Sequence, residues 1–391
     1  MKSVKDIDVR SKRVFVRVDY NVPLDENLNI TDDNRILATL DLIHYLLEQK
    51  AKIILASHLG RPDGRQDAKL SLAPVCKRLS QLIKKEVLFA KECVGEKVSR
   101  MVSQLNDGQI LLLENLRFHS EEKDNGDAFS KQLADFCDIY VNNAFAVSHR
   151  NQASVTGIPK FTSVCVPGFL LEKEVRLYRD AVENPKKPLV AVIGGAKVSS
   201  KLAALENMLN FVDKLIIGGA MANTFLKSQG CDTKGSMIEK DLLSKAQDII
   251  EKAEKKNIDL LLPIDLICGD KPTENADIKE VLLDEIPEKW MAFDIGPKSA
   301  QIYAEALKDA KTIVWNGPMG VFEIEKFMSG TKAVADAIAD ASAFSIVGGG
   351  DTVLAAKLCS VAKKVSYIST GGGAFLHLME GRKLPGMAAL E

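Results

Sequence analysis

Short apolar runs of strand character alternate along the chain with longer stretches whose apolar residues recur at the helical period of about 3.6. The clearest helical stretch is 35–49, where Ile36, Leu40 and Ile43 keep this period. Alternation of strands with helices predicts an α/β protein whose parallel sheets carry helices on both faces. The apolar runs begin at 13, 52, 109, 139, 189, 215, 313, 344 and 365, and the predicted helices of the second half span 200–210, 222–229, 239–256, 300–310 and 330–340.

The length of 391 residues exceeds what one ordinary core buries, so two domains are expected. A predicted helix at 170–182 is followed by Pro185 and Pro188, which stop it, and it serves as a connector. We therefore predict two doubly wound, Rossmann-like parallel-sheet domains joined by a helix. The first domain is placed at 1–168, the interdomain helix at 169–185, and the second domain starts at 186.

Composition narrows the class of protein. The residues are 46% hydrophobic and 27% charged, which is a globular profile, and the net charge of -1 gives no pull toward nucleic acid or an anionic membrane. No apolar run has the length of a membrane span, and the N-terminus lacks an apolar signal core, so a cytoplasmic location is expected. The seven cysteines are scattered without a CxxC pair, which favours reduced thiols over disulfides or a zinc site.

The stretch FSIVGGGDTVLAA near the C-terminus is the first candidate for chemistry. An apolar run is broken by three glycines at 348–350, and Asp351 and Thr352 then suit a helix start. A strand, a glycine turn and a helix N-terminus make an anion site, because backbone N–H groups are free and the helix dipole favours negative charge. Asp351 is placed to hold Mg²⁺ there. The alternative is a tight turn in which Asp351 only caps the helix.

Three more strand-to-glycine turns occur in the second half. They are GGAKVSSK from Gly194, GGA from Gly218 and TGGGA from Thr370. Four such turns predict one sheet whose strand ends converge on a phosphorylated ligand. Neither GxGxxG nor GxxxxGK[ST] occurs, which counts against a dinucleotide fingerprint and against a P-loop.

Other residues of the second half also suit a nucleotide. Lys197 and Lys201 are four apart, so on the predicted helix they share one face toward a phosphate chain. Glu323 ends the turn WNGPMGVFE, where a carboxylate can accept both hydroxyls of a ribose; a solvated loop glutamate is the alternative. The turn DIGPKS, which contains Gly296, caps the next helix.

Polar side chains follow the apolar runs of the first half. They are Asp19, Asn21, Arg35, His58, Arg61, Arg117 and Arg150. In an open parallel sheet such loops gather at one edge, and the planar fork of arginine binds two oxygens of a phosphate or carboxylate. One arginine is more often a surface salt bridge, but four at equivalent places predict a site for a small, multiply charged anion. His58 and His149 have no Asp or Glu at metal-ligand spacing and are expected to donate to that anion.

These residues resemble the phosphoglycerate kinase family over essentially the whole chain. The resemblance implies reversible exchange of ATP and 3-phosphoglycerate with ADP and 1,3-bisphosphoglycerate in glycolysis and gluconeogenesis, with Mg²⁺ and without nucleic-acid or membrane partners. It implies a monomer, a second domain that ends at 374, and a tail at 375–391 that returns to the first domain. The matching motifs are RVDYNVP, SHLGRP, LLLENLRFH, SHRNQAS, GGAKVSSKL, GGAMANTFL, DIGPKS, WNGPMGVFE, GGGDT, STGGGAF and GRKLPGMAAL.

The resemblance also implies residue roles. Around the phosphoglycerate it places Asp19, Asn21, Arg35, His58, Leu59, Gly60, Arg61, Arg117 and Arg150. Around the nucleotide it places Lys197, Lys201, Gly219, Gly296, Asn316, Pro318, Glu323, Gly349, Gly350, Asp351 and Thr352, with Asp351 as the Mg²⁺ contact. The expected catalytic residues are Arg35, Lys197, Lys201, Gly350 and Gly372.

The expected chemistry needs no general base, because the acceptor oxygen is already an anion at about pH 7. Positioning, charge stabilisation of an in-line transfer and a closing motion that excludes water are expected instead. One stretch departs from the family, since Asn143 stands where an aspartate is usual and Ala146 where a glycine is usual. We expect this departure to affect the affinity for the substrate and to leave the activity in place. A nicotinamide-dependent oxidoreductase and a non-catalytic nucleotide-binding protein on the same fold are the alternatives.

Overall fold

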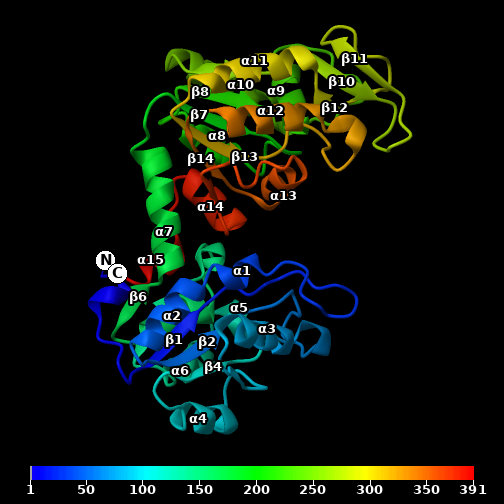
Figure 1. Cartoon of the computed structure of the whole chain (residues 1–391). Coiled ribbons are helices and arrows are strands. Elements are labelled where there is room, and N and C mark those ends of the chain that lie inside the picture. Colours follow the sequence, from blue (N-terminus) through cyan, green and yellow to red (C-terminus); the bar gives the residue numbers. More distant parts are fainter. Residues whose placement is uncertain (1) are drawn as a thin grey trace. The chain divides into compact units, whose positions relative to one another are not determined.

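The computed structural model describes residues 2–391, which form two compact units. The first unit comprises residues 2–175 and Lys383–Glu391, and the second comprises Arg176–Arg382. The boundary falls within helix α7 (Phe169–Tyr178), which Figure 1 labels. Both units are built on parallel sheets with interleaved helices, so the predicted fold class is confirmed.

A parallel sheet of six strands, in the order β3-β4-β2-β1-β5-β6, forms the centre of the first unit. Its strands are β1 (Arg13–Arg17), β2 (Lys52–Ala56), β3 (Leu88–Phe89), β4 (Ile110–Leu112), β5 (Ile139–Asn142) and β6 (Cys165–Pro167). In β1, Val14 and Val16 pack in one core cluster, while Phe15 and Arg17 point to the opposite face, and all four are buried. Both faces of the sheet are covered, which explains the nearly continuous apolar runs.

The helices of the first unit are short. They are α1 (Asn34–Leu37), α2 (Leu40–Glu48), α3 (Ala73–Ile83), α4 (Glu96–Ser103), α5 (Ser120–Asp124), α6 (Asp127–Ala134) and, in the tail, α15 (Pro385–Ala388). The single helix predicted at 35–49 is therefore two helices. At the break, the hydroxyl of Thr39 donates to the carbonyl of Ile36 at 2.8 Å and lies 3.0 Å from the hydroxyl of Tyr20. These bonds turn the chain within what the apolar period predicts as one helix.

The second unit has a parallel sheet of six strands in the order β15-β14-β13-β7-β8-β9. Its strands are β7 (Leu189–Ile193), β8 (Lys214–Ile217), β9 (Asp259–Leu261), β13 (Thr312–Asn316), β14 (Phe344–Val347) and β15 (Tyr367–Ile368). Its helices are α8 (Leu202–Met208), α9 (Ala220–Ser228), α10 (Leu243–Lys255), α11 (Pro297–Lys308), α12 (Ser329–Asp340), α13 (Gly350–Leu358) and α14 (Gly372–Met379). Trp315, fully buried on β13, lies in the core between this sheet and its helices.

A three-stranded antiparallel sheet in the second unit was not predicted. It consists of β10 (Asp265–Gly269), β11 (Ile278–Leu282) and β12 (Met291–Ile295), which gather at one end of this unit in Figure 1. In β11 only Val281 is buried. A strand with one buried residue carries no apolar period, so its sequence gives no strand signal.

The expected tail boundary at 375 is corrected to 383. Residues 372–382 pack within the second unit, where α14 lies against α8. Nδ2 of Asn207 donates to the carbonyl oxygen of Met379 at 2.8 Å. The hydroxyl of Tyr178 donates to the carbonyl oxygen of Leu378 at 2.6 Å. In the first unit, the tail is held at Gly386, whose N–H donates to the carbonyl of Ser148 at 2.8 Å.

In each sheet the direction in which successive strands are added reverses between two adjacent central strands. These are β1 and β5 in the first unit and β7 and β13 in the second. Loops at the carboxyl ends of strands diverge at such a point and leave a crevice for a ligand. Some of the predicted loops follow these strands, such as the loop with Asp19 after β1 and the turn at Gly194 after β7. Within residues 2–391, no helix is both long and apolar enough to cross a membrane.

Candidate active site

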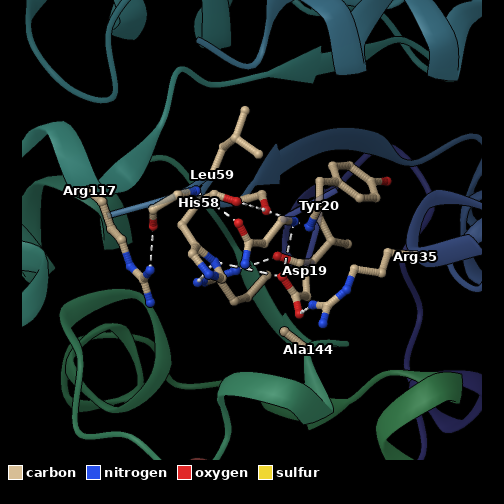
Figure 2. Close-up of polar contacts among 12 residues, drawn as sticks. Asp19, Tyr20, Arg35, His58, Leu59, Arg117 and Ala144 are labelled. Carbon is tan, nitrogen blue, oxygen red and sulfur yellow. Dashed lines mark hydrogen bonds and ion pairs between the residues drawn. The ribbon is translucent and has the colours of Figure 1, made fainter. Parts of the chain in front are cut away.

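Asp19 is the centre of a charged cluster in the loop that follows β1. It is 7% exposed, its Oδ2 accepts from Nη1 of Arg35, and its Oδ1 lies 3.8 Å from Nδ1 of His58. The backbone N–H of Asn21 also donates to Oδ1, at 3.1 Å. Figure 2 shows Arg35 and His58 on opposite sides of the carboxylate. The fold thus brings together three predicted residues from the ends of β1 and β2 and from α1.

The surroundings of His58 favour its neutral form. Its pKa is held well below the usual value, first by burial and then by the charges of surrounding arginines. These arginines are Arg17, Arg117, Arg150 and Arg35. Nη2 of Arg17, which can only donate, lies 3.3 Å from Nδ1 of His58. This contact favours Nδ1 as the acceptor and the ring proton on Nε2.

A cavity of about 580 Å³ lies beside this cluster and is lined by Arg61, Arg117 and Arg150. Nη1 of Arg117 donates to the carbonyl of Gly60 at 2.6 Å, whereas its buried Nη2 has no hydrogen-bond partner within residues 2–391. Burial, followed by the charges of Arg150 and Arg17, lowers the pKa of Arg117 to about 10. Three guanidinium groups around one cavity are an arrangement suited to a phosphate.

The loop after β2 contains Leu59 and Gly60, and the side chain of Asn21 helps to hold its backbone. Oδ1 of Asn21 accepts from the N–H of Gly60 at 2.8 Å, and the N–H of Leu59 donates to Oδ1 of Asn115 at 3.2 Å. Gly60 has φ +63, and a Cβ there would meet Leu70 at 2.7 Å, so the position requires glycine. The loop is thereby held in one conformation beside the arginines.

Three buried residues near this site were not predicted from the sequence. Arg17 lies in the apolar run RVFVRV and is fully buried. Asn115 is fully buried and donates Nδ2 to the carbonyls of Leu59 and Leu70, at 2.7 and 2.9 Å. Gln152 lines the cavity. Only Arg17 had a usable signal, namely a charge inside a strand whose neighbours are apolar.

In the second unit, the glycine turns after three strands are bonded to one another. The N–H of Gly194, after β7, donates to the carbonyl of Asn316 at the end of β13, at 3.1 Å. The N–H of Gly195 donates to the carbonyl of Pro318 at 3.1 Å, and that of Gly219, after β8, to the carbonyl of Met319 at 2.9 Å. Two of the four predicted glycine turns, those at Gly194 and Gly218, are thus joined through the turn that follows β13.

The prediction that Lys197 and Lys201 share a helical face is wrong. The helix begins only at Leu202, and both lysines lie in the preceding loop. Glu239 holds this loop, because its carboxylate accepts from the backbone N–H of Ser199 at 3.0 Å. Nζ of Lys201 turns inward and donates to the carbonyls of Gly194 and Asn316, both at 2.7 Å, while Lys197 is exposed. Burial lowers the pKa of Lys201 to about 8, and the charge of Asp351 opposes this shift.

The N-termini of α13 and α14 lie side by side. A Cβ on Gly372, the first residue of α14, would lie 3.3 Å from Cα of Gly349. The N–H of Gly317 donates to the hydroxyl of Thr352 at 2.8 Å. This bond connects α13 to the turn after β13. Gly350 has open space where a Cβ would stand, and Asp351 is exposed in the first turn of α13. Two helix N-termini with free N–H groups make this surface suited to phosphates.

The remaining predicted residues lie in the loop after β13 or next to it. Pro318 is buried and Glu323 is exposed. The N–H of Val321 donates to the carbonyl of Phe293 on β12 at 2.8 Å, which connects this loop to the strand that leads to Gly296. Gly296 is the N-cap residue of α11 and packs closely on Asp265. A Cβ at position 296 would lie only 2.3 Å from Cγ of Asp265. Gly296 therefore has a structural reason to be glycine besides any contact with a nucleotide.

Asn143, the departure noted in the sequence, does not line the arginine cavity. Its side chain is buried, and Oδ1 accepts from the N–H of Leu170 at 2.9 Å in the first turn of α7. The fold thus uses this position to cap a helix.

Comparison with known proteins agrees with this geometry. The family model described as phosphoglycerate kinase matches residues 4–382. The phosphoglycerate kinase of Desulforapulum autotrophicum is 59% identical over 391 residues, covering 100% of both chains, and that of Aquifex aeolicus is 52% identical over 390 residues, covering 100% of this chain and 98% of the relative.

The chain belongs to the phosphoglycerate kinase family.

Solved structures of this family agree with the fold over the whole chain. The phosphoglycerate kinase from Coxiella burnetii has a TM-score of 0.91 at 43% identity, covering 100% of this chain and 98% of the other. The phosphoglycerate kinase from Pyrococcus horikoshii has a TM-score of 0.84 at 32% identity, with the same coverage. The family resemblance read from the motifs is thereby confirmed, and the oxidoreductase alternative finds no support.

Proposed function

We propose that this chain is an active phosphoglycerate kinase that transfers a phosphoryl group reversibly between MgATP and 3-phosphoglycerate. The observation that carries the proposal is the cavity of about 580 Å³ that is lined by Arg61, Arg117 and Arg150. The planar fork of arginine binds two oxygens of a phosphate at once, so three guanidinium groups around one cavity suit a small, multiply charged anion. The family of the chain supports the same substrate.

The phosphate of 3-phosphoglycerate belongs in this cavity, because three guanidinium groups meet there. The glycerate end then extends toward Asp19, Asn21 and His58, with its carboxylate directed to Arg35. Arg35 is suited to this role because its side chain is 36% exposed while its partner Asp19 is buried. The guanidinium therefore remains accessible to a ligand.

ATP or ADP belongs at the joined glycine turns of the second unit. The phosphates lie at the N-termini of α13 and α14, near Gly349, Gly350 and Gly372, where the first backbone N–H groups of a helix have no partner within the helix. Lys201 and Lys197 supply positive charge, and Glu323 is exposed to accept the ribose hydroxyls. Gly219, Gly296, Asn316, Pro318 and Thr352 shape the surrounding loops.

The residues present fit a magnesium ion that arrives with the nucleotide. Asp351 offers one exposed carboxylate beside the phosphate-binding turns, and Mg²⁺ prefers one or two carboxylates together with phosphate oxygens. Among residues 2–391, no group of three or more His, Cys, Asp or Glu side chains is placed to hold a metal. When bound, Mg²⁺ would neutralise charge that develops on the phosphates.

The chemistry follows from charges and positions. In the direction of ATP use, a carboxylate oxygen of 3-phosphoglycerate attacks the γ-phosphorus, and the bond to ADP breaks on the opposite side. The attacking oxygen is an anion, so no proton has to be removed. Arg35, Lys197 and the helix N-termini at Gly350 and Gly372 would stabilise the phosphoryl group in transit. Because the two ligands belong to different units, the transfer requires a closing motion that encloses both ligands and excludes water.

Turnover with MgATP and 3-phosphoglycerate, coupled to an enzyme that consumes 1,3-bisphosphoglycerate, tests this proposal. We expect turnover of roughly 1–100 s⁻¹ or faster. MgADP binding without turnover would favour the non-catalytic alternative and contradict the proposal. The cytoplasmic location and the monomeric state belong to the same proposal, and a stable dimer in sedimentation would contradict the latter.

A further inference from the structure

A series of buried polar contacts connects His58 to Glu122 on α5. Nη2 of Arg17 lies 3.3 Å from Nδ1 of His58, and Nε of Arg17 donates to Oγ of Ser154 at 2.7 Å. Ser154 donates to both oxygens of Glu122, from Oγ to Oε1 at 2.6 Å and from its backbone N–H to Oε2 at 2.9 Å. Four residues from four segments of the chain thus form one continuous network.

Glu122 supplies the charge that this network needs. Arg17 and Ser154 are fully buried and Glu122 is 1% exposed. A guanidinium removed from water is strongly unfavourable unless a carboxylate compensates it. The carboxylate that raises the pKa of Arg17, against the lowering caused by burial, is that of Glu122. The same charge also acts on Arg117 in the cavity.

The direction of each hydrogen bond is determined by Arg17, which can only donate. Oγ of Ser154 accepts from Arg17, so its single proton goes to Glu122. Nδ1 of His58 likewise faces Arg17, so the imidazole keeps its proton on Nε2. A carboxylate at position 122 therefore holds Ser154 as the acceptor for Arg17, and Arg17 in this position directs its Nη2 to Nδ1 of His58.

We propose that Glu122 is a positioning residue for the 3-phosphoglycerate subsite, which holds Arg17 through Ser154 and thereby keeps His58 in the Nε2–H form beside Asp19. This inference rests on the function proposed above. The sequence gives no sign of it, because the stretch SEEKD reads as the solvated first turn of a helix. Only the fold turns the second glutamate inward while Glu121 stays exposed.

The variant Glu122→Gln tests the role with almost no change in size. An amide has one acceptor oxygen where the carboxylate has two, so one of the two bonds from Ser154 would be lost and Ser154 would hold Arg17 less firmly. We expect the KM for 3-phosphoglycerate to rise by about tenfold while the KM for MgATP stays within about twofold. We also expect ¹⁵N chemical shifts of the five histidines to show His58 leaving the pure Nε2–H form.

Glu121→Gln is the matched control, since it removes the same charge from the adjacent exposed position and should leave both readouts unchanged. Ser154→Ala breaks the network while keeping both charges, and should raise the KM for 3-phosphoglycerate in the same way even where Glu122→Gln fails to fold. Unchanged KM and histidine shifts in a folded Glu122→Gln or Ser154→Ala would overturn the inference. So would an equal rise in both KM values. Absence of turnover in the unsubstituted chain would instead defeat the proposed function, and the histidine shifts would still test Glu122.

Discussion

Nη1 of Arg35 donates to Oδ2 of Asp19, so the cation that begins α1 is held by the buried carboxylate that follows β1. An arginine in the first turn of a helix is opposed by the helix dipole, and here Asp19 offsets that cost. Because Arg35 remains partly exposed, an anionic ligand can compete for it. This pairing makes the role of Arg35 testable.

We expect Arg35→Ala to lower kcat by about 10²- to 10³-fold, because a cation that faces the transferred phosphoryl group stabilises the transition state more than the bound nucleotide. The KM for MgATP should change by less than about threefold. Steady-state kinetics with both substrates measures the split. Arg78→Ala is the control, since Arg78 pairs with Asp33 at 2.7 Å in the same unit but outside the site. Normal turnover in Arg35→Ala would end the assignment.

Lys201 should make nucleotide affinity depend on pH. Its pKa is lowered to about 8 by burial, so the free protein loses this cation as the pH rises above that value. We expect the KM for MgATP to rise above about pH 8. In Lys201→Met this rise should be absent and the KM high throughout. A profile for Lys201→Met that still rises through pH 8 would show that another group is responsible.

The same lysine makes a prediction about stability. The folded state binds this proton less tightly than the unfolded state, whose lysine titrates near 10.5. The destabilisation is complete below about pH 8 and disappears as the pH rises toward 10.5, so the free energy of unfolding should increase over this window relative to Lys201→Met. Denaturant unfolding of both proteins at pH 7.5 and pH 10 measures the difference. A constant difference would contradict the low pKa.

Two glycine substitutions should separate function from folding. Gly350→Ala places a methyl group in open space, so the melting temperature should be unchanged or slightly higher, yet turnover should fall strongly if a phosphate contacts this backbone. Gly219→Ala places Cβ 2.5 Å from the N–H nitrogen of Gly195 at φ +69, and should destabilise the protein by about 1–3 kcal/mol or more. Thermal unfolding and kinetics on both variants test this contrast. Full activity in Gly350→Ala would remove this glycine from the site.

Asn143→Asp should affect stability more than catalysis. Oδ1 of Asn143 caps α7, whereas its buried Nδ2 has no partner within residues 2–391. Aspartate keeps the acceptor, removes the unsatisfied N–H group and places an anion at a helix N-terminus, so the free energy of unfolding should rise by up to about 1 kcal/mol. The KM for 3-phosphoglycerate should stay within about twofold. A larger change in KM would show that position 143 acts on the substrate.

Asn142→Asp makes the same substitution at the adjacent residue, where we expect the opposite effect on stability. Nδ2 of Asn142 donates to Oγ of Ser148 at 3.1 Å and to the carbonyl of Gly386 at 3.3 Å. Aspartate cannot make these bonds, so it should destabilise the first unit by about 1–3 kcal/mol. If both variants shift stability in the same direction, the capping explanation for Asn143 is wrong.

The period of apolar residues was enough to predict both parallel sheets and most helices of the second unit. It failed where burial no longer follows the period. In β11 only Val281 is buried, and at Thr39 a side-chain hydrogen bond divides one predicted helix into two. Residues 197–201 were assigned to a helix, but Glu239, distant in sequence, holds them as a loop.

The sequence by itself determined which chemical groups follow which strands, because a strand end and a glycine or arginine are visible as neighbours in the chain. The tertiary structure alone decided which of these groups are buried, paired or left open. Lys201 turns inward while Lys197 stays exposed, and Glu122 is buried while Glu121 is not. The physical reason is that desolvation and pairing depend on contacts between residues far apart in the chain, such as Arg17 and Ser154, and no local pattern encodes those contacts.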